Sequence, residues 1–201
     1  MSYKDKLSNY QWDCLVEVGC HSRFSDYIAE FSRTVSGKGV DIGAGPGGHN
    51  GQFFTHCKEI DGCDADIDVV STLPTDTYSN TYQYFLGHQN LPYLESELDF
   101  VVCSCVIQHL NNFEELEKGI KEISRVLKSG GQFYLMFKAG SNDTTLTHFN
   151  SYYQQKRTFR VFSPSNIIDL CKSNNLTLST VEKLVDDNWI PYCCLTFTKN
   201  Y

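Results

Sequence analysis

The sequence predicts an α/β fold with one doubly wound, mostly parallel sheet flanked by helices. Apolar runs typical of strands alternate with longer helical stretches along the chain. One run, "FVVCSCVI" at 100–107, is almost continuously apolar, which is typical of a strand buried on both faces. A glycine-rich turn follows the first run, as in sheets that bind ligands at the carboxyl ends of their strands. With 201 residues, the chain can form one sizeable core but not two full domains.

Five strands are expected in the first two thirds of the chain. They cover 37–44, 58–66, 81–87, 98–106 and 131–138. The helix between the last two is indicated by apolar residues at three-and-four spacing, which predict one buried stripe. Asn112 can cap its start and Gly130 can close its end. Glu114–Lys118 and Glu117–Lys121 are expected on its solvated side. The stripe consists of Phe113, Leu116, Ile120, Ile123 and Leu127.

Beyond the fifth strand, Ser163 and Pro164 predict the start of another helix. Two strand-like runs follow at 176–185 and 191–200, with a turn-prone segment between them, so we expect a reversed C-terminal hairpin. The single domain over 1–201 then divides into four parts. These are an N-terminal helical cover (1–36), a ligand-binding core (37–138), an insertion (139–162), and the last helix with the hairpin (163–201).

Composition excludes several classes of protein. The net charge of −7 disfavours a large nucleic-acid interface, because an acidic surface repels phosphates. The sequence has no apolar run long enough to span a membrane and no secretory signal. Nine cysteines occur without a C-x-x-C pair, and the histidines form no ligand cluster, so no metal site is expected. We therefore expect a reduced, cytoplasmic protein.

The stretch "VDIGAGPGGHN" at 40–50 matches G-x-G-x-x-G at Gly43, Gly45 and Gly48. Such glycines let the backbone approach a ligand and direct amides toward it from a helix N-terminus. Asp41 discriminates between ligands: its carboxylate works against a pyrophosphate but favours a ligand that carries an ammonium and a sulfonium. Asp64, at the end of the second strand, can accept hydrogen bonds from ribose hydroxyls. The alternative for Asp64 is a helix cap.

Together these residues resemble the class I S-adenosylmethionine-dependent methyltransferases, whose fold is Rossmann-like. "VDIGAGPG" is similar to the family's first motif and "DGCDAD" to its second-strand acid. "FLGHQNLPY", "LDFVVCSCVIQHL" and "ISRVLKSGGQFYLMF" are similar to the following strands and helix. The resemblance implies S-adenosylmethionine as cofactor and S-adenosylhomocysteine as product. The cofactor contacts it implies are Asp41, Gly43, Ala44, Gly45, Asp64, Ala65, His88, Gln89 and Cys103.

One position departs from the family. An acid often follows the glycine that ends the third strand and binds the adenine amino group. His88 stands there in this chain, and Gln89 or a backbone group is the alternative contact.

Methyl transfer from a sulfonium is an in-line displacement that sometimes needs a base. The candidate base is His109, just past the fourth strand, because imidazole titrates near neutrality. The alternative is that His109 caps the next helix or supports the cofactor loop.

The insertion at 139–162 mixes aromatic and basic residues. Aromatic rings can wall a small acceptor, and an arginine can bind a carboxylate or phosphate. The alternative is a surface loop whose aromatics pack on the sheet. At the other end of the chain, Tyr10 or Trp12 is expected to cover the cofactor, as in similar enzymes. The predicted acceptor contacts are His148, Tyr152, Tyr153, Arg157 and Arg160.

The sequence thus favours methylation of an oxygen or nitrogen nucleophile on a small molecule, and the arginines of the insertion favour an acceptor with an acidic group. A nucleic-acid or protein methyltransferase of the same fold, and a non-catalytic S-adenosylmethionine-binding subunit, remain alternatives. A nicotinamide oxidoreductase is disfavoured by Asp41 and by the lack of a Tyr-x-x-x-Lys pair.

Overall fold

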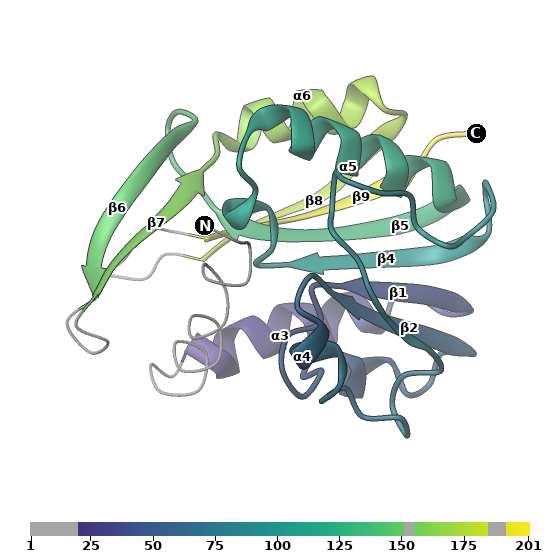
Figure 1. Cartoon of the computed structure of the whole chain (residues 1–201). Helices are drawn as coiled ribbons and strands as arrows, with labels where there is room; N and C mark the ends of the chain where they lie inside the picture. The colour runs from purple at the N-terminus through teal and green to yellow at the C-terminus, as the bar shows by residue number, and fades with distance from the viewer. Residues whose placement is uncertain (1–19, 151–154, 185–191) are drawn as a thin grey trace.

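The computed structural model describes residues 20–150, 155–184 and 192–201. A seven-stranded sheet crosses the molecule in the order β3-β2-β1-β4-β5-β9-β8 (Figure 1). The first five strands run parallel, whereas β9 runs antiparallel to both of its neighbours. The predicted fold class and the reversed C-terminal hairpin are therefore confirmed. The strands are β1 (Lys38–Ile42), β2 (Glu59–Asp64), β3 (Thr81–Gln83), β4 (Leu98–Ser104), β5 (Leu127–Lys138), β8 (Leu176–Leu184) and β9 (Tyr192–Lys199).

Helices cover both faces of this sheet. α5 (Phe113–Val126) and α6 (Pro164–Ser173) lie on one face, and α3 (Cys20–Ser32) and the short α4 (Ile67–Val70) lie on the other (Figure 1). The apolar run of β4 supplies both layers, since Val101 and Cys103 belong to one core cluster and Phe100 and Val102 to the other. Burial of alternate residues on opposite faces explains why this strand has no polar side.

α5 begins as the sequence predicts, because the Asn112 side chain accepts a hydrogen bond from the Glu115 backbone N at 2.9 Å. The apolar stripe is shorter than predicted. Phe113 is 41% exposed, since it is the first residue of the helix and lies at its end, whereas Leu116 and the later members are fully buried. On the other side of the helix, Glu114 and Lys118 form the expected ion pair at 2.7 Å.

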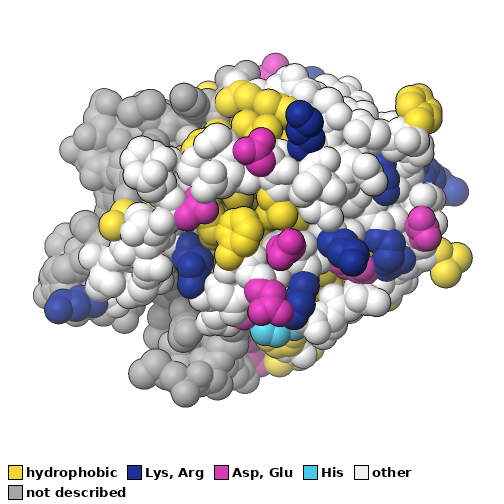
Figure 2. Space-filling view, turned by 90° about the horizontal axis from the view of Figure 1, so that it is seen from above, with side chains coloured by type: hydrophobic (Ala, Val, Ile, Leu, Met, Phe, Trp, Pro, Cys, Tyr) yellow, Lys and Arg dark blue, Asp and Glu magenta, His cyan; other side chains and the backbone are white. Residues whose placement is uncertain are grey.

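The face that α5 and α6 form carries acidic and basic side chains close together around apolar ones (Figure 2). Acidic side chains therefore lie beside the basic ones on the part of this face that the structure describes. Among the described residues, no helix is long and apolar enough to cross a membrane.

Two connections differ from the sequence prediction. The glycine turn leads into a 3-10 helix, η1 (Gly51–Phe54), and not into an α-helix, because glycine is a poor helix former and the segment 47–51 holds three of them. The insertion forms an antiparallel hairpin, β6 (Thr144–Asn150) with β7 (Gln155–Val161), which lies outside the main sheet (Figure 1). The hairpin stands beyond the carboxyl ends of the parallel strands, near the second 3-10 helix, η2 (Ile107–His109).

Candidate active site

The glycine turn after β1 is packed on one side and open on the other. Gly43 and Ala44 donate backbone hydrogen bonds to the Cys63 carbonyl at 2.8 and 2.9 Å, which ties the turn to β2. A Cβ on Gly43 would lie 2.2 Å from Val106, but a Cβ on Gly45 would meet nothing within 4 Å. Both glycines have positive φ, +70° and +69°. The open side at Gly45 is a cradle that a side chain would fill, which fits a ligand held against the backbone.

Asp41 lies beneath this turn, not at the surface of the site. It is fully buried and accepts hydrogen bonds from the Tyr78 hydroxyl at 2.7 Å and the Asn50 amide at 3.4 Å. Burial raises the pKa of Asp41 to about 6, although both hydrogen bonds act to lower it. The sequence analysis expected a carboxylate next to the ligand. The structure instead encloses the carboxylate within the protein, where Tyr78 and Asn50 are its hydrogen-bond partners.

Asp64 is the last residue of β2 and lies beside the glycine turn. Its two oxygens accept hydrogen bonds from the backbone N of Gly45 at 3.1 Å and of Asp66 at 3.0 Å. Asp66, and not Asp64, caps α4, because its side chain accepts from Asp68 N at 2.9 Å. The alternative role of Asp64 as helix cap is therefore excluded. A carboxylate has about four acceptor sites, so Asp64 can still accept from ribose hydroxyls.

The segment after β3 forms the rim where the adenine is expected. His88 pairs with Glu115 of α5 at 3.3 Å, and Gln89 donates to the Gln83 carbonyl at 3.2 Å. Gln83 in turn donates to the Ala65 carbonyl at 2.9 Å. The predicted residues Ala65, His88 and Gln89 are thus joined to this rim by Gln83 and Glu115. The sequence analysis missed both, since neither belongs to a motif.

Cys103 is fully buried within the core, and burial raises the pKa of its thiol. Its position does not support the predicted cofactor contact, because the side chain is enclosed between the layers. The next residue but one, Cys105, has φ +60° and donates its backbone N–H to the Met136 carbonyl at 2.8 Å. The chain therefore turns sharply at the carboxyl end of β4 before entering η2.

η2 carries His109 together with a residue that the sequence analysis missed. His109 is half-buried and donates its backbone N–H to the Val106 carbonyl at 2.9 Å. The neighbouring Gln108 is 3% exposed, and its Oε1 has no hydrogen-bond partner among the described parts of the chain. A buried carbonyl without a donor is costly, so this oxygen is available to an N–H or O–H of a bound molecule.

The β6–β7 hairpin contains the predicted acceptor contacts. His148 and Arg157 face each other in the register of the two strands, although the structure does not describe their side chains. Tyr152 and Tyr153 lie outside the described residues, as do Tyr10 and Trp12.

Arg160 binds the protein itself. Its guanidinium donates to the Leu110 carbonyl at 3.0 Å and to the Asn111 carbonyl. An arginine whose donors already serve two backbone carbonyls braces the hairpin against the segment after η2. These two hydrogen bonds give Arg160 a structural role, and the guanidinium keeps further N–H donors.

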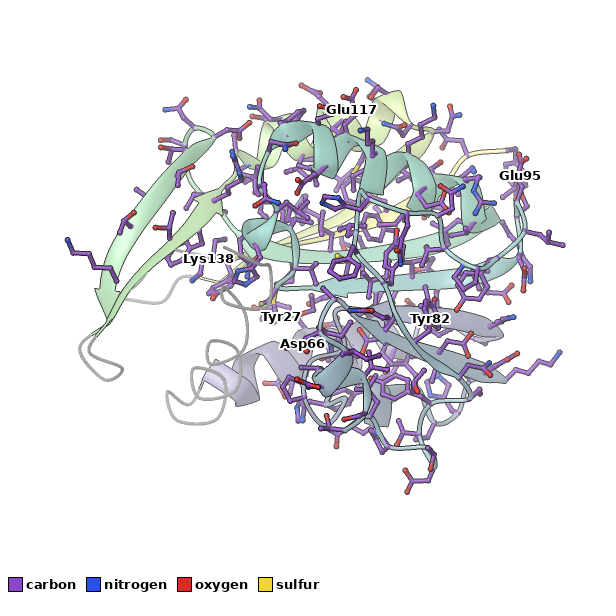
Figure 3. All side chains as sticks on the ribbon, in the orientation of Figure 1. Tyr27, Asp66, Tyr82, Glu95, Glu117 and Lys138 are labelled. Atoms are coloured by element: carbon purple, nitrogen blue, oxygen red, sulfur yellow. The ribbon has the colours of Figure 1, made fainter. Side chains whose placement is uncertain are left out.

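The cation at this end of the sheet that sequence analysis overlooked is Lys138, the last residue of β5. It is 4% exposed, and its ammonium lies 4.7 Å from the centre of the Phe159 ring and 4.3 Å from that of Tyr192. In Figure 3, Lys138 lies at the end of the sheet next to the hairpin, whereas Glu95 lies at the opposite end. The carboxyl ends of β4 and β5 thus combine an imidazole, an amide oxygen and a cation.

Comparisons with known proteins identify a family model and solved structures with the same fold. Residues 40–135 match the family model described as a methyltransferase domain. An uncharacterized methyltransferase, YcgJ of Bacillus subtilis, is 26% identical over 162 residues, which cover 75% of this chain and 63% of YcgJ. The chain therefore spans less than two thirds of that relative. The solved structure of YcgJ superimposes with a TM-score of 0.68 over 88% of this chain and 99% of that one.

Two further solved structures share the fold at low identity. The N-methyltransferase NodS from Bradyrhizobium japonicum, in complex with S-adenosylhomocysteine, has a TM-score of 0.72 at 15% identity and covers 99% of this chain and 97% of its own. SpnF, described as a [4+2]-cyclase, has a TM-score of 0.71 at 14% identity and covers 89% of this chain and 81% of its own. The family match, together with the fold that these structures share, identifies residues 40–135 as part of a class I S-adenosylmethionine-dependent methyltransferase domain.

Proposed function

We propose that this chain transfers the methyl group of S-adenosylmethionine to an oxygen or nitrogen atom of a small molecule that carries an acidic group. The proposal of an acidic group is based on Lys138, a buried cation at the carboxyl end of β5 that contacts the rings of Phe159 and Tyr192. An aromatic wall with one buried charge is suited to a small, partly apolar anion. NodS, which shares the fold, is described as an N-methyltransferase, and this supports nitrogen as one acceptor atom.

In the cofactor half of this site, Asp64 would accept hydrogen bonds from the ribose, and the backbone at Gly45 would lie against the ligand. Asp41 supplies a fixed negative charge below the turn, which favours a cationic donor over a diphosphate. His88, Gln89 and Gln83 would surround the adenine. The positively charged sulfur of S-adenosylmethionine makes its methyl carbon the electrophile.

In the acceptor half, the nucleophile attacks that methyl carbon, a new C–O or C–N bond forms, and the C–S bond breaks to leave a neutral thioether. His109 takes the proton that the nucleophile loses, because an imidazole can act as a general base and His109 lies just past the carboxyl end of β4. Gln108 Oε1 accepts a hydrogen bond from the acceptor and so orients the nucleophile toward the methyl carbon. Such orientation supplies a large part of the rate enhancement in a displacement reaction. Lys138 pairs with the acidic group.

Methyl transfer should be measured as S-adenosylhomocysteine release across matched pairs of acceptors, each an acid and its neutral amide. The acids should be preferred, and Lys138→Met should raise KM for the acids by about tenfold while leaving KM for the amides unchanged. Lys138→Arg should keep the preference. Lys156→Met, on the exposed surface of β7, is the matched control. Equal rates for acids and amides in the wild type would refute the acidic acceptor.

The role of His109 is tested separately with any acceptor found in this way. His109→Gln should lower kcat by about a hundredfold and remove the acidic limb of the pH profile, since the base is lost. Binding of S-adenosylmethionine should not change. Full turnover at every pH would assign His109 to a supporting role.

A further inference from the structure

A buried tyrosine that belongs to none of the sequence motifs contacts the glycine turn on the side where Asp41 lies. Tyr78 lies in the connection between α4 and β3 and is 2% exposed. Its hydroxyl is shared between Asp41 Oδ2 at 2.7 Å and the Gly48 carbonyl at 3.1 Å, and it accepts a hydrogen bond from the Gly51 backbone N at 3.1 Å. One hydroxyl therefore joins the buried carboxylate to both ends of the loop that follows the turn.

The ring of Tyr78 fills a slot that only glycines leave open. A Cβ would lie 2.3 Å from this ring at Gly48, 2.6 Å at Gly51 and 2.8 Å at Gly62. Real Cβ contacts are not that short, so a side chain at any of the three would displace the ring. Gly62 belongs to β2, Gly48 to the glycine turn, and Gly51 is the first residue of η1. The ring is thus held between the sheet and the loop and sets the distance between them.

We propose that Tyr78 is a positioning residue of the S-adenosylmethionine site: its ring supports the glycine turn, and its hydroxyl holds the Asp41 carboxylate beneath the ligand. The inference rests on the proposed role of Asp41 as the charge that favours a cationic methyl donor. Tyr78 itself does not reach the ligand, because it is enclosed between β2 and the loop.

The electrostatics around Asp41 support a donor role for the hydroxyl. Burial beside the Asp41 carboxylate raises the pKa of Tyr78, so the phenol stays protonated and donates. Asp64, Cys63 and Cys103 are the other titratable groups that act on Asp41 or are acted on by it. Burial raises the pKa of both thiols, so they are neutral, whereas the Asp64 carboxylate raises the pKa of Asp41. The Tyr78 hydrogen bond therefore opposes the burial and Asp64 contributions, which favour protonation of Asp41.

Removing the Tyr78 hydroxyl should shift the pH midpoint of S-adenosylmethionine binding as well as weaken the binding. The dissociation constant of S-adenosylmethionine should be measured by calorimetry from pH 5.5 to 8.5 for the wild type and Tyr78→Phe. Because the pKa of Asp41 is about 6, wild-type affinity should fall as the pH drops through that value. In Tyr78→Phe the midpoint should rise by about one unit, with affinities converging at the alkaline end.

Tyr93→Phe is the matched control, since its hydroxyl donates to another buried carboxylate, Asp61, at 2.7 Å. It removes a similar hydrogen bond away from the turn and should leave the midpoint in place. Asn50→Leu removes the weaker donor to Asp41 and should shift the midpoint in the same direction by less, which keeps the test available if Tyr78→Phe does not fold. A uniform loss of affinity at every pH, or no shift, overturns the positioning role.

The premise about Asp41 is tested by Asp41→Asn. Binding in this variant should be weaker at alkaline pH, and any pH dependence that is left belongs to Asp64. Adding Tyr78→Phe to Asp41→Asn should produce no further shift of the midpoint. If Asp41→Asn binds S-adenosylmethionine as the wild type does, the proposed role of Asp41 fails. If Asp41→Asn weakens binding but Tyr78→Phe shifts nothing, the role of Tyr78 alone fails.

Discussion

Gly45 and Gly130 have nearly the same backbone conformation, with φ +69° and +80°, and a Cβ on either would meet nothing within 4 Å. They differ in place, because Gly45 faces the proposed cofactor and Gly130 precedes the core of β5. Substitutions at these two glycines therefore distinguish the backbone strain of a side chain at positive φ, which both share, from a clash with the ligand, which only Gly45 would cause.

Gly45→Ala and Gly130→Ala should each lower the free energy of unfolding by about 1–2 kcal/mol, the cost of a side chain at positive φ. Gly45→Ala should also weaken S-adenosylmethionine binding by about tenfold or more, because the new methyl group would clash with the ligand. A tenfold loss of affinity corresponds to about 1.4 kcal/mol. Chemical denaturation and calorimetry measure the two effects. Loss of affinity in both variants, or in neither, would contradict a ligand at Gly45.

The buried Asp41 carboxylate should destabilise the folded protein at neutral pH. Its folded pKa, about 6, lies above the ordinary value of 3.8, so its contribution to stability is fully present below pH 3.8 and is lost as the pH rises through about 6. Asp41→Asn should therefore unfold with about 1–3 kcal/mol more free energy than wild type at pH 8 and match it near pH 4. Asp169→Asn, exposed on α6, is the control. A constant difference across pH would disprove this origin.

For single residues, the sequence analysis was successful where a residue belongs to a recognisable motif. Asp64 was placed correctly at the end of β2 because the motif fixes its spacing. Tyr78 was missed because it stands alone in a polar connection, and its partners are glycines far from it in sequence. Lys138 was also missed, since nothing in a strand sequence tells whether a terminal lysine is solvated or enclosed by rings from β7 and β9.

Between elements, the contact that matters most for the acceptor side joins β7 to the segment after η2. Arg160 makes it with two backbone carbonyls, so the position of the hairpin and that of His109 are linked. An arginine can serve two acceptors at once, but a lysine has no planar fork.

Arg160→Lys should loosen η2 without affecting the cofactor half. Backbone amides at 107–112 should exchange with solvent about tenfold faster, equivalent to about 1.4 kcal/mol, while the affinity for S-adenosylmethionine stays the same. Lys156→Gln on the same strand should change neither. Were Arg160 an acceptor ligand, turnover would fall while hydrogen exchange in this segment stayed at the wild-type rate.

Elements were predicted well where periodicity is strong. β4 and α5 have long apolar patterns, and their boundaries agree within a few residues. The strands of the β6–β7 hairpin were not predicted within the insertion, because "TTLTHFN" and "QKRTFRV" are polar and pair with each other outside the main sheet. The helix expected after the glycine turn was wrong for a related reason, since that expectation came from the motif and ignored the glycines that follow it.

For the whole molecule, ligand binding is a direct test of which cofactor the fold holds. S-adenosylmethionine at a hundred times its dissociation constant should add about 2.7 kcal/mol to the free energy of unfolding. NAD at the same concentration should add nothing, because its diphosphate meets the buried Asp41 charge. A thermal shift assay compares the two. Stabilisation by NAD alone would overturn the assignment of the cofactor.

The place of β9 between β5 and β8 has a consequence for how the chain is made. β8 leaves the ribosome first, yet it has no partner until residues 192–199 follow it. Until then β5 presents a bare edge to any other nascent chain nearby, which is a route to aggregation. β8 therefore gains its place in the sheet only after β9 has been synthesised, so the order of assembly at this edge does not follow the order of synthesis.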